Sequence, residues 1–379
     1  MPADDDLNRL VTANTGTSLW GNGSYAYDAM GNLTSRSLGV PPVDDGTVRS
    51  LPGRHLRAST SVTGQVDRLS FTFQGTTPKI SVVTSNGLDH TLGYDAAGNE
   101  TGYFASRAYS SRNLMTTVTD TSAEGPAHQI TYGYDYRGVR VSRTETPTDA
   151  GSAKRYFFYT PELQLLSSTV DDSNNVWGQS AHIMAAPLTM NREVVWFAGQ
   201  PVAEYGPPRT ADSVTPLSAH HTSDTNTPAN NLFYTFTDHL GTPLLQTDPS
   251  TAIVWRAEHE PYGNIYLMRK GSRADQPLRF PGQEAAMTWE GTEENYNVFR
   301  WYRAGWGRYT QADPLDVDAF TPVRERQRTA RAVYEYATGN PPRFIDDKGL
   351  KPSCPVCGVD CASGDWVGVG TFASGGILF

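Results

Sequence analysis

Several features are scarce in this chain, and each scarcity excludes a class of protein. The 379 residues contain three cysteines, all at position 354 or later, so a disulfide framework cannot hold most of the fold. No apolar run approaches the roughly 20 residues that a membrane-spanning helix needs. The first six residues are acidic and lack the basic and apolar regions of a signal peptide. We therefore expect no membrane span and no signal peptide in this sequence.

Positive charge and chemical motifs are also scarce. The formal net charge of −9 argues against a nucleic-acid partner held through phosphate contacts. The sequence contains no phosphate-binding loop, cysteine–histidine metal cluster or nucleophile elbow. His220 and His221 are adjacent in a polar segment, without a carboxylate or cysteine at ligand spacing. We expect no cofactor and no metal, and a conventional enzyme acting on small molecules is the least favoured class.

Glycine, proline and tyrosine are abundant, and one phrase recurs. The 35 glycines, 25 prolines and 19 tyrosines suit many short strands joined by turns. The phrase Tyr-Asp-x-x-Gly-Asn occurs at residues 27–32 and 94–99, with a decayed copy from Tyr134 and a weaker one from Tyr109. The residues that define the three better copies are Tyr27, Asp28, Gly31, Tyr94, Asp95, Gly98, Tyr134, Asp135 and Gly138.

Each phrase has the pattern of a strand that enters a turn and leaves as a strand. Residues before the tyrosine alternate, the aspartate can accept a backbone hydrogen bond two residues on, and glycine can adopt a positive φ. Aromatic and β-branched runs at 154–159 and 193–197 predict further strands. We therefore predict an all-β fold of stacked hairpins. Residues 6–10 resemble the second half of a repeat, so we expect a longer array before them.

Five segments in the second half of the chain carry a family resemblance. They lie at residues 233–243, 254–263, 278–283, 297–302 and 307–314, and include Phe280-Pro281-Gly282-Gln283. In this order they resemble the RHS-repeat-associated core of RHS/YD-repeat proteins, which include bacterial polymorphic toxins and the C component of insecticidal toxin complexes. The resemblance implies a hairpin strip that spirals into a closed hollow shell, and a core with a little helix that plugs one end.

The resemblance also implies four regions. YD-repeat hairpins occupy residues 1–145, further hairpins with a polar loop at 206–231 occupy 146–232, the core occupies 233–350, and a short tail occupies 351–379. Within the core, Arg324, Arg328 and Arg331 would share one face of a helix, as an anion or cargo contact or as a solvated surface.

In members of the resembled family, the core ends in two acidic phrases and the chain is cut after the second. The matching phrases here begin at Asp313 and Asp346, which gives a predicted scissile bond between Leu350 and Lys351. Two carboxyls near one peptide bond can divide the roles of acid and base. Arg308 is the candidate cation that steadies a carboxylate or a developing oxyanion. The alternative is that Asp313 and Asp346 only cap turns.

The sequence departs from the family pattern in ways that bear on this activity. Asp316 replaces the glycine of the first phrase and Asp347 replaces the proline of the second, and the two phrases lie farther apart than usual. The tail is too short for an ordinary domain. It contains Cys354, Cys357 and Cys361, which make an incomplete zinc site.

Three functions are compatible with these patterns. The first is a shell segment that encloses or presents a C-terminal polypeptide and cuts itself after Leu350. Its partners would be its own cargo or delivery-machinery proteins, and its location would be secreted or at the cell surface after export by a secretion system. The second is a non-catalytic surface module that binds carbohydrate or protein through exposed aromatic residues. The third is a degenerate remnant that keeps only the fold.

Overall fold

The computed structural model contains strands and short turns in all the parts that it describes. The described residues are 3–15, 21–39, 48–49, 66–103, 105–120, 128–148, 151–171, 189–206, 231–269, 276–289, 292–314, 333–350 and 352–353. These ranges contain no α-helix, and they include the 3-10 turns η1 (Ala304–Trp306) and η3 (Ala337–Gly339). No helix among them is long and apolar enough to cross a membrane. The all-β prediction is confirmed, whereas the described core has no α-helix, and the helix expected near Arg324, Arg328 and Arg331 lies outside the described residues.

The first sheet has seven antiparallel strands in the order β1-β2-β3-β4-β6-β7-β8. Each strand therefore pairs with its neighbour in the chain, except that β5 lies in another sheet. The bounds are β1 (Ala3–Asp4), β2 (Leu10–Asn14), β3 (Asn22–Tyr27), β4 (Leu33–Gly39), β6 (Val66–Phe73), β7 (Ile80–Ser85) and β8 (Leu88–Thr91).

The second sheet has fifteen strands and runs from β9 to β22 in chain order, with β5 paired to β22 at the far edge. All its pairs are antiparallel, as hairpins require. The bounds are β5 (Val48–Arg49), β9 (Gly93–Tyr94), β10 (Glu100–Tyr103), β11 (Ala105–Tyr109), β12 (Met115–Asp120), β13 (His128–Tyr134), β14 (Arg140–Thr148), β15 (Gly151–Tyr159), β16 (Leu165–Asp171), β17 (Thr189–Phe197), β18 (Gln200–Gly206), β19 (Asn231–Thr237), β20 (Pro243–Thr247), β21 (Ile253–His259) and β22 (Ile265–Arg269).

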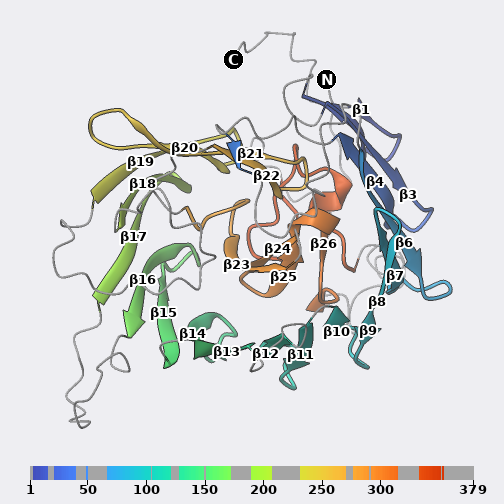
Figure 1. Ribbon diagram of the computed structural model, residues 1–379, viewed down its shortest axis with the longest axis horizontal. Coiled ribbons are helices and arrows are strands. Elements are labelled where there is room, and N and C mark those ends of the chain that lie inside the picture. The colour runs from blue at the N-terminus through green and yellow to red at the C-terminus, as the bar shows by residue number, and fades with distance from the viewer. Residues whose placement is uncertain are drawn as a thin grey trace.

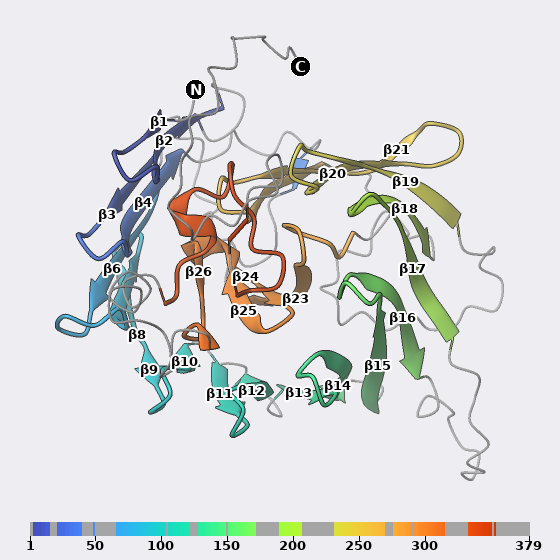
Figure 2. The same ribbon diagram turned by 180° about the vertical axis from the view of Figure 1, so that it is seen from behind.

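A third, four-stranded sheet lies inside the ring that the other two sheets form. Figures 1 and 2 show β1 to β22 arranged around the centre, which holds the third sheet and the segment 333–350. The third sheet consists of β23 (Glu284–Trp289), β24 (Thr292–Asn297), β25 (Arg300–Arg303) and β26 (Arg308–Tyr309).

One turn geometry joins most of the hairpins. In the phrase at 27–32, the N–H of Asp28 donates to the carbonyl of Asn32 (3.0 Å), and the N–H of Gly31 donates to the carbonyl of Asp28 (3.2 Å). Oδ1 of Asp28 accepts from the N–H groups of Met30 and Asn32, both at 2.9 Å. Gly31 has φ +89°, which glycine adopts at little cost. The two backbone bonds recur in turns that begin at Asp5, Asp95, Ser110, Asp135, Thr160, Asp238, Asp248 and Glu260.

The tyrosine of the phrase connects each hairpin to the one before it. The hydroxyl of Tyr27 donates to the carbonyl of Leu10 (2.8 Å), and that of Tyr134 donates to the carbonyl of Met115 (2.6 Å). In both cases the acceptor is five residues after the first residue of the preceding turn. Trp196 makes the equivalent bond through its indole N–H to the carbonyl of Leu165 (2.8 Å). The aromatic residue therefore sets the distance between consecutive hairpins.

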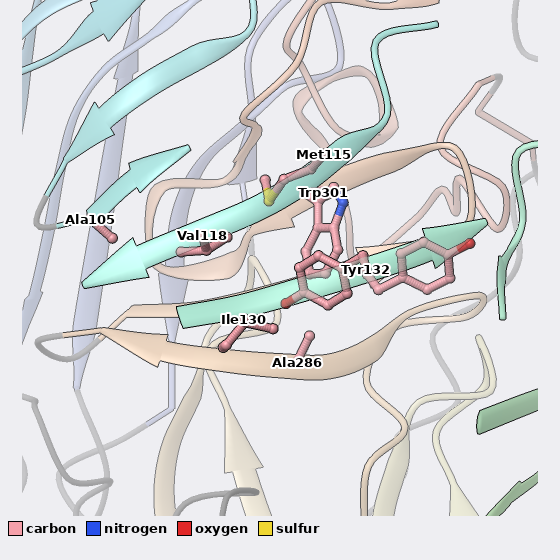
Figure 3. Packing of buried hydrophobic residues seen from close by; sticks show 8 residues of the cluster. Ala105, Met115, Val118, Ile130, Tyr132, Ala286 and Trp301 are labelled. Carbon is pink, nitrogen blue, oxygen red and sulfur yellow. The ribbon is translucent and has the colours of Figure 1, made fainter. Parts of the chain in front are cut away.

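The hydrophobic core lies between the inner face of the ring and the third sheet. Met115, Val118 and Ile130 of the ring pack against Ala286 and Trp301 of the third sheet, and all five side chains are buried (Figure 3). Trp306 packs in the same way against the ring residues Phe71 and Tyr103. The third sheet therefore fills the ring as its core.

Buried ion pairs join the third sheet to the ring. Arg303 of β25 contacts Glu100 of β10 (2.6 Å) and Glu294 of β24, while Arg107 of β11 contacts both glutamates. Arg140 of β14 pairs with Glu284 of β23 (2.7 Å). Removal of one partner from such a pair leaves an uncompensated buried charge, so these contacts favour one orientation of the core.

The ends of the ring meet at a seam that the segment 333–350 covers. The hydroxyl groups of Tyr27, from β3, and Tyr262, from the turn after β21, contact each other. The Tyr262 hydroxyl donates to the carbonyl of Gly339 (3.0 Å), and the Tyr27 hydroxyl oxygen lies 3.3 Å from the same carbonyl. Beside them is a cavity of about 20 Å³, room for one water molecule, with Glu335 and Arg308 in its lining. Glu335 as a residue is half-buried, but its Oε1 is enclosed and has no hydrogen-bond partner.

Candidate functional site

The two predicted aspartates lie on either side of one buried arginine, Arg300. Its Nη2 is 3.1 Å from Oδ2 of Asp313 and 3.1 Å from Oδ2 of Asp346. Asp346 is fully buried, while the side chain of Asp313 is 16% exposed. The structure thus brings together residues that are 33 positions apart in the sequence.

Arg300 is held at the start of β25 by contacts on every side of its guanidinium group. Its plane lies 3.6 Å from the ring centre of Tyr309, its Nη1 donates to the carbonyl of Val333 (3.2 Å), and its Nε donates to the carbonyl of Gly349. The planar guanidinium has five donors in fixed directions, which suits a site where several oxygens converge. Arg300 therefore links both acidic phrases to the third sheet.

Asp346 begins a turn that resembles the repeat turns but uses its carboxylate differently. Its Oδ1 accepts the N–H of Leu350 (2.8 Å), just as Oδ1 of Asp28 accepts the N–H of Asn32. In the repeat turn, Oδ2 of Asp28 is occupied by the side-chain amide of Asn32 (2.9 Å). Leu350 has no such amide, and Oδ2 of Asp346 is directed to Arg300 instead. One carboxylate oxygen of Asp346 therefore caps the turn, and the other contacts Arg300.

Tyr309 and Asn297 complete the surroundings of Asp346. The hydroxyl of Tyr309 donates to Oδ2 of Asp346 (2.8 Å), and Nδ2 of Asn297 donates to the carbonyl of Asp346 and to the Tyr309 hydroxyl, both at 2.8 Å. Burial raises the pKa of Tyr309 well above its usual value, and the charge of Asp346 raises it further. Tyr309 therefore stays protonated and remains a donor to the carboxylate.

Close backbone packing fixes the turn against the third sheet. A Cβ atom on Gly282 would lie 1.7 Å from the carbonyl oxygen of Asp347, so only glycine fits there. A Cβ atom on Gly349 would lie 2.7 Å from the carbonyl oxygen of Asn297. Both glycines have positive φ, +81° and +68°. The Phe-Pro-Gly-Gln phrase thus packs directly against the backbone of the turn at Asp346.

Arg308, the predicted cation, lies elsewhere. Its guanidinium donates to the carbonyl of Pro78 (2.9 Å) and stacks over the ring of Tyr334 at 4.5 Å. Arg300 holds the position between the aspartates that we had expected for Arg308. The reason is strand alternation, since Arg308 extends from β26 toward the first sheet and not toward residue 346. Asp347 is exposed, and it packs against Gly282 through its backbone carbonyl.

Sequence reasoning therefore missed three residues of the cluster: Asn297, Arg300 and Tyr309. All three belong to the phrases that carry the family resemblance. The signal available in the sequence was an arginine between two aromatic residues, Phe299-Arg300-Trp301. Several predicted residues fall outside the described part of the chain, namely Lys351, Asp316, His220, His221, Cys354, Cys357 and Cys361. Within the described part, no group of three or more His, Cys, Asp or Glu side chains is placed to hold a metal ion.

Residues 232–268, which include β19 to β21, match the family model described as RHS protein. The resemblance of the chain to RHS proteins is thereby confirmed. Over 249 residues, or 65% of its length, it is 26% identical to Double-stranded DNA deaminase toxin A of Burkholderia cenocepacia. Over 114 residues, or 30% of its length, it is 31% identical to Toxin protein Tse5 of Pseudomonas aeruginosa. The matched stretches cover 15% and 8% of those two toxins.

Solved structures share the fold of this RHS chain. The crystal structure of TcdB2-TccC3-Cdc42 matches with a TM-score of 0.54 and 16% identity, over 92% of this chain and 17% of that one. The Photorhabdus luminescens Tc holotoxin pore matches with a TM-score of 0.54 and 16% identity, over 93% of this chain and 17% of that one. At such low identity the likeness concerns the fold alone, and the chain matches 17% of each of those longer chains.

Proposed function

We propose that this RHS chain is a shell segment that encloses or presents the polypeptide following its core, in the manner of a toxin-delivery protein. The support is architectural: a ring of hairpins surrounds a core that buried ion pairs lock in place, and the same fold occurs in the TccC3-containing structures. The two relatives named above are bacterial toxins. The proposed partners are the chain's own C-terminal cargo and delivery-machinery proteins, of the kind that TcdB2 represents for TccC3. The proposed location is outside the producing cell or at its surface.

We further propose that the chain cuts its own Leu350–Lys351 bond. The observation that carries this proposal is that one nitrogen of Arg300 contacts both aspartates while the second carboxylate oxygen of Asp346 holds the N–H of Leu350. Asp346 is therefore only one residue's backbone away from the carbonyl to be attacked. A reacting group held this way has a large proximity advantage, which suits a single turnover.

The contacts suggest separate roles for the groups. Asp313 is the more exposed carboxylate and accepts a proton from the attacking water. Asp346 orients Leu350, and Arg300 stabilises the negative charge that develops on the carbonyl oxygen. Water adds to the carbonyl carbon as Asp313 takes its proton. Asp313 then gives this proton to the amide nitrogen as the C–N bond breaks, and the products are a carboxylate on Leu350 and an amine on Lys351. The cation Arg300 lies between the two carboxylates.

The test is a time course of the purified full-length chain by intact mass spectrometry. We expect cleavage into residues 1–350 and a fragment of 29 residues (379 minus 350). Asp346→Asn keeps an oxygen that can cap Leu350 but removes the charge, so it should leave the chain whole, as should Asp313→Asn. Arg300→Lys should slow the cut, since lysine cannot contact four oxygens in fixed directions.

Asp238→Asn is the matched control. Asp238 caps an Asp-x-x-Gly turn with the same bonds, from Leu240 (2.9 Å) and Thr242 (2.8 Å), but lies in the ring. It should be cut like the wild type. A wild-type chain that stays whole would refute self-cleavage, and an Asp346→Asn chain that is cut at the wild-type rate would refute the aspartate mechanism. Either result leaves the shell proposal standing.

A second candidate function is supported by a row of exposed aromatic side chains. Tyr205, Tyr234 and Phe236 of β18 and β19 are 39%, 44% and 51% exposed. Tyr205 lies opposite Leu232, two positions from Tyr234 on the neighbouring strand, so the three side chains are close to one another. Flat aromatic surfaces of this kind suit stacking on sugars or on another protein. Loss of polysaccharide binding in Tyr234→Ala, but not in Thr131→Ala on β13, would support this function.

A further inference from the structure

The turn at Asp346 differs from the repeat turns in where the strand pairing resumes. In all nine repeat turns, the residue before the turn pairs with the residue five positions after its first residue; examples are Tyr27 with Leu33 and Tyr134 with Arg140. By that rule Ile345 would pair with Lys351. It pairs instead with Ser353, seven positions after Asp346.

The pairing at Ser353 is made by two short backbone hydrogen bonds. The N–H of Ile345 donates to the carbonyl of Ser353 (3.0 Å), and the N–H of Ser353 donates to the carbonyl of Ile345 (2.7 Å). Two residues, Lys351 and Pro352, therefore lie between the turn and the pair as an insertion into the repeat register. Pro352 has no N–H to donate to a ladder, so it suits an unpaired position.

The carbonyl group at the proposed cut also differs from its counterparts. In the nine repeat turns, the carbonyl of the fifth residue accepts the N–H of the first, as Asn32 accepts from Asp28. Among the described residues around Asp346, no such bond forms between the Asp346 N–H and the Leu350 carbonyl, although the side-chain cap to the Leu350 N–H is kept.

The backbone is nevertheless fixed on both sides of this point. Upstream, the carbonyl of Gly349 accepts from Arg300, the carbonyl of Lys348 accepts from the N–H of Phe299 (3.3 Å), and Asp346 holds Leu350. Downstream, Ser353 is fixed by its pair with Ile345. The carbonyl of Leu350 thus takes no part in the backbone bond that closes the repeat turns, and it lies between two anchored points.

We propose that the Ile345–Ser353 pair is a register clamp that selects the Leu350–Lys351 bond for cleavage. This inference rests on the self-cleavage proposed above. It adds the reason why the nine repeat turns, six of which begin with a capping aspartate, are not substrates. Ser353 acts as a positioning residue: its backbone pair sets the two-residue insertion, and the insertion presents the bond to Asp313 and Asp346.

The test removes the insertion without changing the residues that react. Deletion of residues 351–352 joins Leu350 to Ser353 and restores the register of the repeat turns. The matched control is Lys351→Ser, which creates the same Leu-Ser bond but keeps the insertion. A misplacement of 1 Å can cost a factor of about 100 in rate, so we expect the deletion to slow cleavage about 100-fold and the control to be cut at a rate close to the wild type.

A second pair of measurements separates positioning from general damage. The deletion variant should keep the thermal stability of the wild type, and reinsertion of two glycines should restore cleavage, because the spacing matters and the side chains do not. If the deletion variant is cut as fast as Lys351→Ser, the register inference is wrong while the aspartate pair stands. If the wild type is not cut, both the self-cleavage proposal and the register inference fail. If Asp346→Asn and Asp313→Asn are cut at the wild-type rate while the deletion variant is slowed, the aspartate mechanism alone fails.

Discussion

Glu335 at the seam should make the stability of the fold fall as pH rises from acid to weakly alkaline. Burial raises the pKa of the Glu335 carboxyl from 4.5 to about 8; the charge of Arg9 lowers it, and the charges of Asp5 and Asp28 raise it. In the folded chain the group therefore keeps its proton up to about pH 8, whereas in the unfolded chain it ionises near pH 4.5. The stabilisation is complete below pH 4.5 and is lost as pH rises toward 8.

The size of the effect follows from the width of that window. Each pH unit between the two pKa values lowers the free energy of unfolding by about 1.4 kcal/mol. The loss is about 3 kcal/mol by pH 7 and approaches about 5 kcal/mol by pH 8. Glu335→Gln replaces the protonated acid with a neutral group of the same shape, so its stability should not decline through this window.

The assay is chemical denaturation of wild type and Glu335→Gln at half-unit steps from pH 5 to pH 9. The difference between the two proteins cancels every group that they share, and we expect it to grow in favour of Glu335→Gln as pH rises. Glu162→Gln, at an exposed position in the turn after β15, is the control and should show no such trend. A difference that stays flat over this range would refute a protonated Glu335 at the seam.

Three further predictions concern the support of the site and of the core. Gly282→Ala places a methyl group 1.7 Å from the Asp347 carbonyl, so it should abolish cleavage and lower the melting temperature, whereas Gly75→Ala, with positive φ but no atom within 4 Å, should cost only about 1 kcal/mol. Tyr309→Phe removes one hydrogen bond to the Asp346 carboxylate and should slow cleavage about tenfold, seen in the mass time course; an unchanged rate would show that the bond is not used. Arg303→Ala removes one of the two arginines that contact Glu100 and Glu294 and should destabilise the chain by about 3–5 kcal/mol in denaturant; a loss below about 1 kcal/mol would contradict the buried network.

The hairpin architecture could be predicted from the sequence because its determinants are local. The aspartate cap and the glycine with positive φ act within five residues, so the phrase at 27–32 specifies its own turn. The register between hairpins is also nearly local, since the hydroxyl of Tyr134 donates to the carbonyl of Met115 in the preceding hairpin. The division of the chain at residues 145, 232 and 350 stays a prediction.

The site was only partly predictable because its geometry depends on contacts far apart in the chain. Asp313 and Asp346 could be named from their phrases, but the cation between them could not, since Arg308 and Arg300 are both arginines in core phrases. Which one faces the aspartates depends on how β25 and β26 sit inside the ring. The closeness of Gly282 to Asp347 likewise spans 65 positions and leaves no local pattern.

The shared turn of this protein has a consequence for how such a chain can change. The repeat turn at Asp28 and the turn at Asp346 differ in few features. The Asp28 turn has a side-chain amide at its fifth residue, whereas the Asp346 turn has a facing arginine and resumes its strand pairing two residues later. A chain made of many copies of one turn therefore holds many starting points for a cut, and a designer could move the point at which cargo separates by grafting these features onto another turn. Conversely, an asparagine at the fifth position, such as Asn32 or Asn99, donates its side-chain amide to the aspartate at the first position, so that this carboxylate is already occupied.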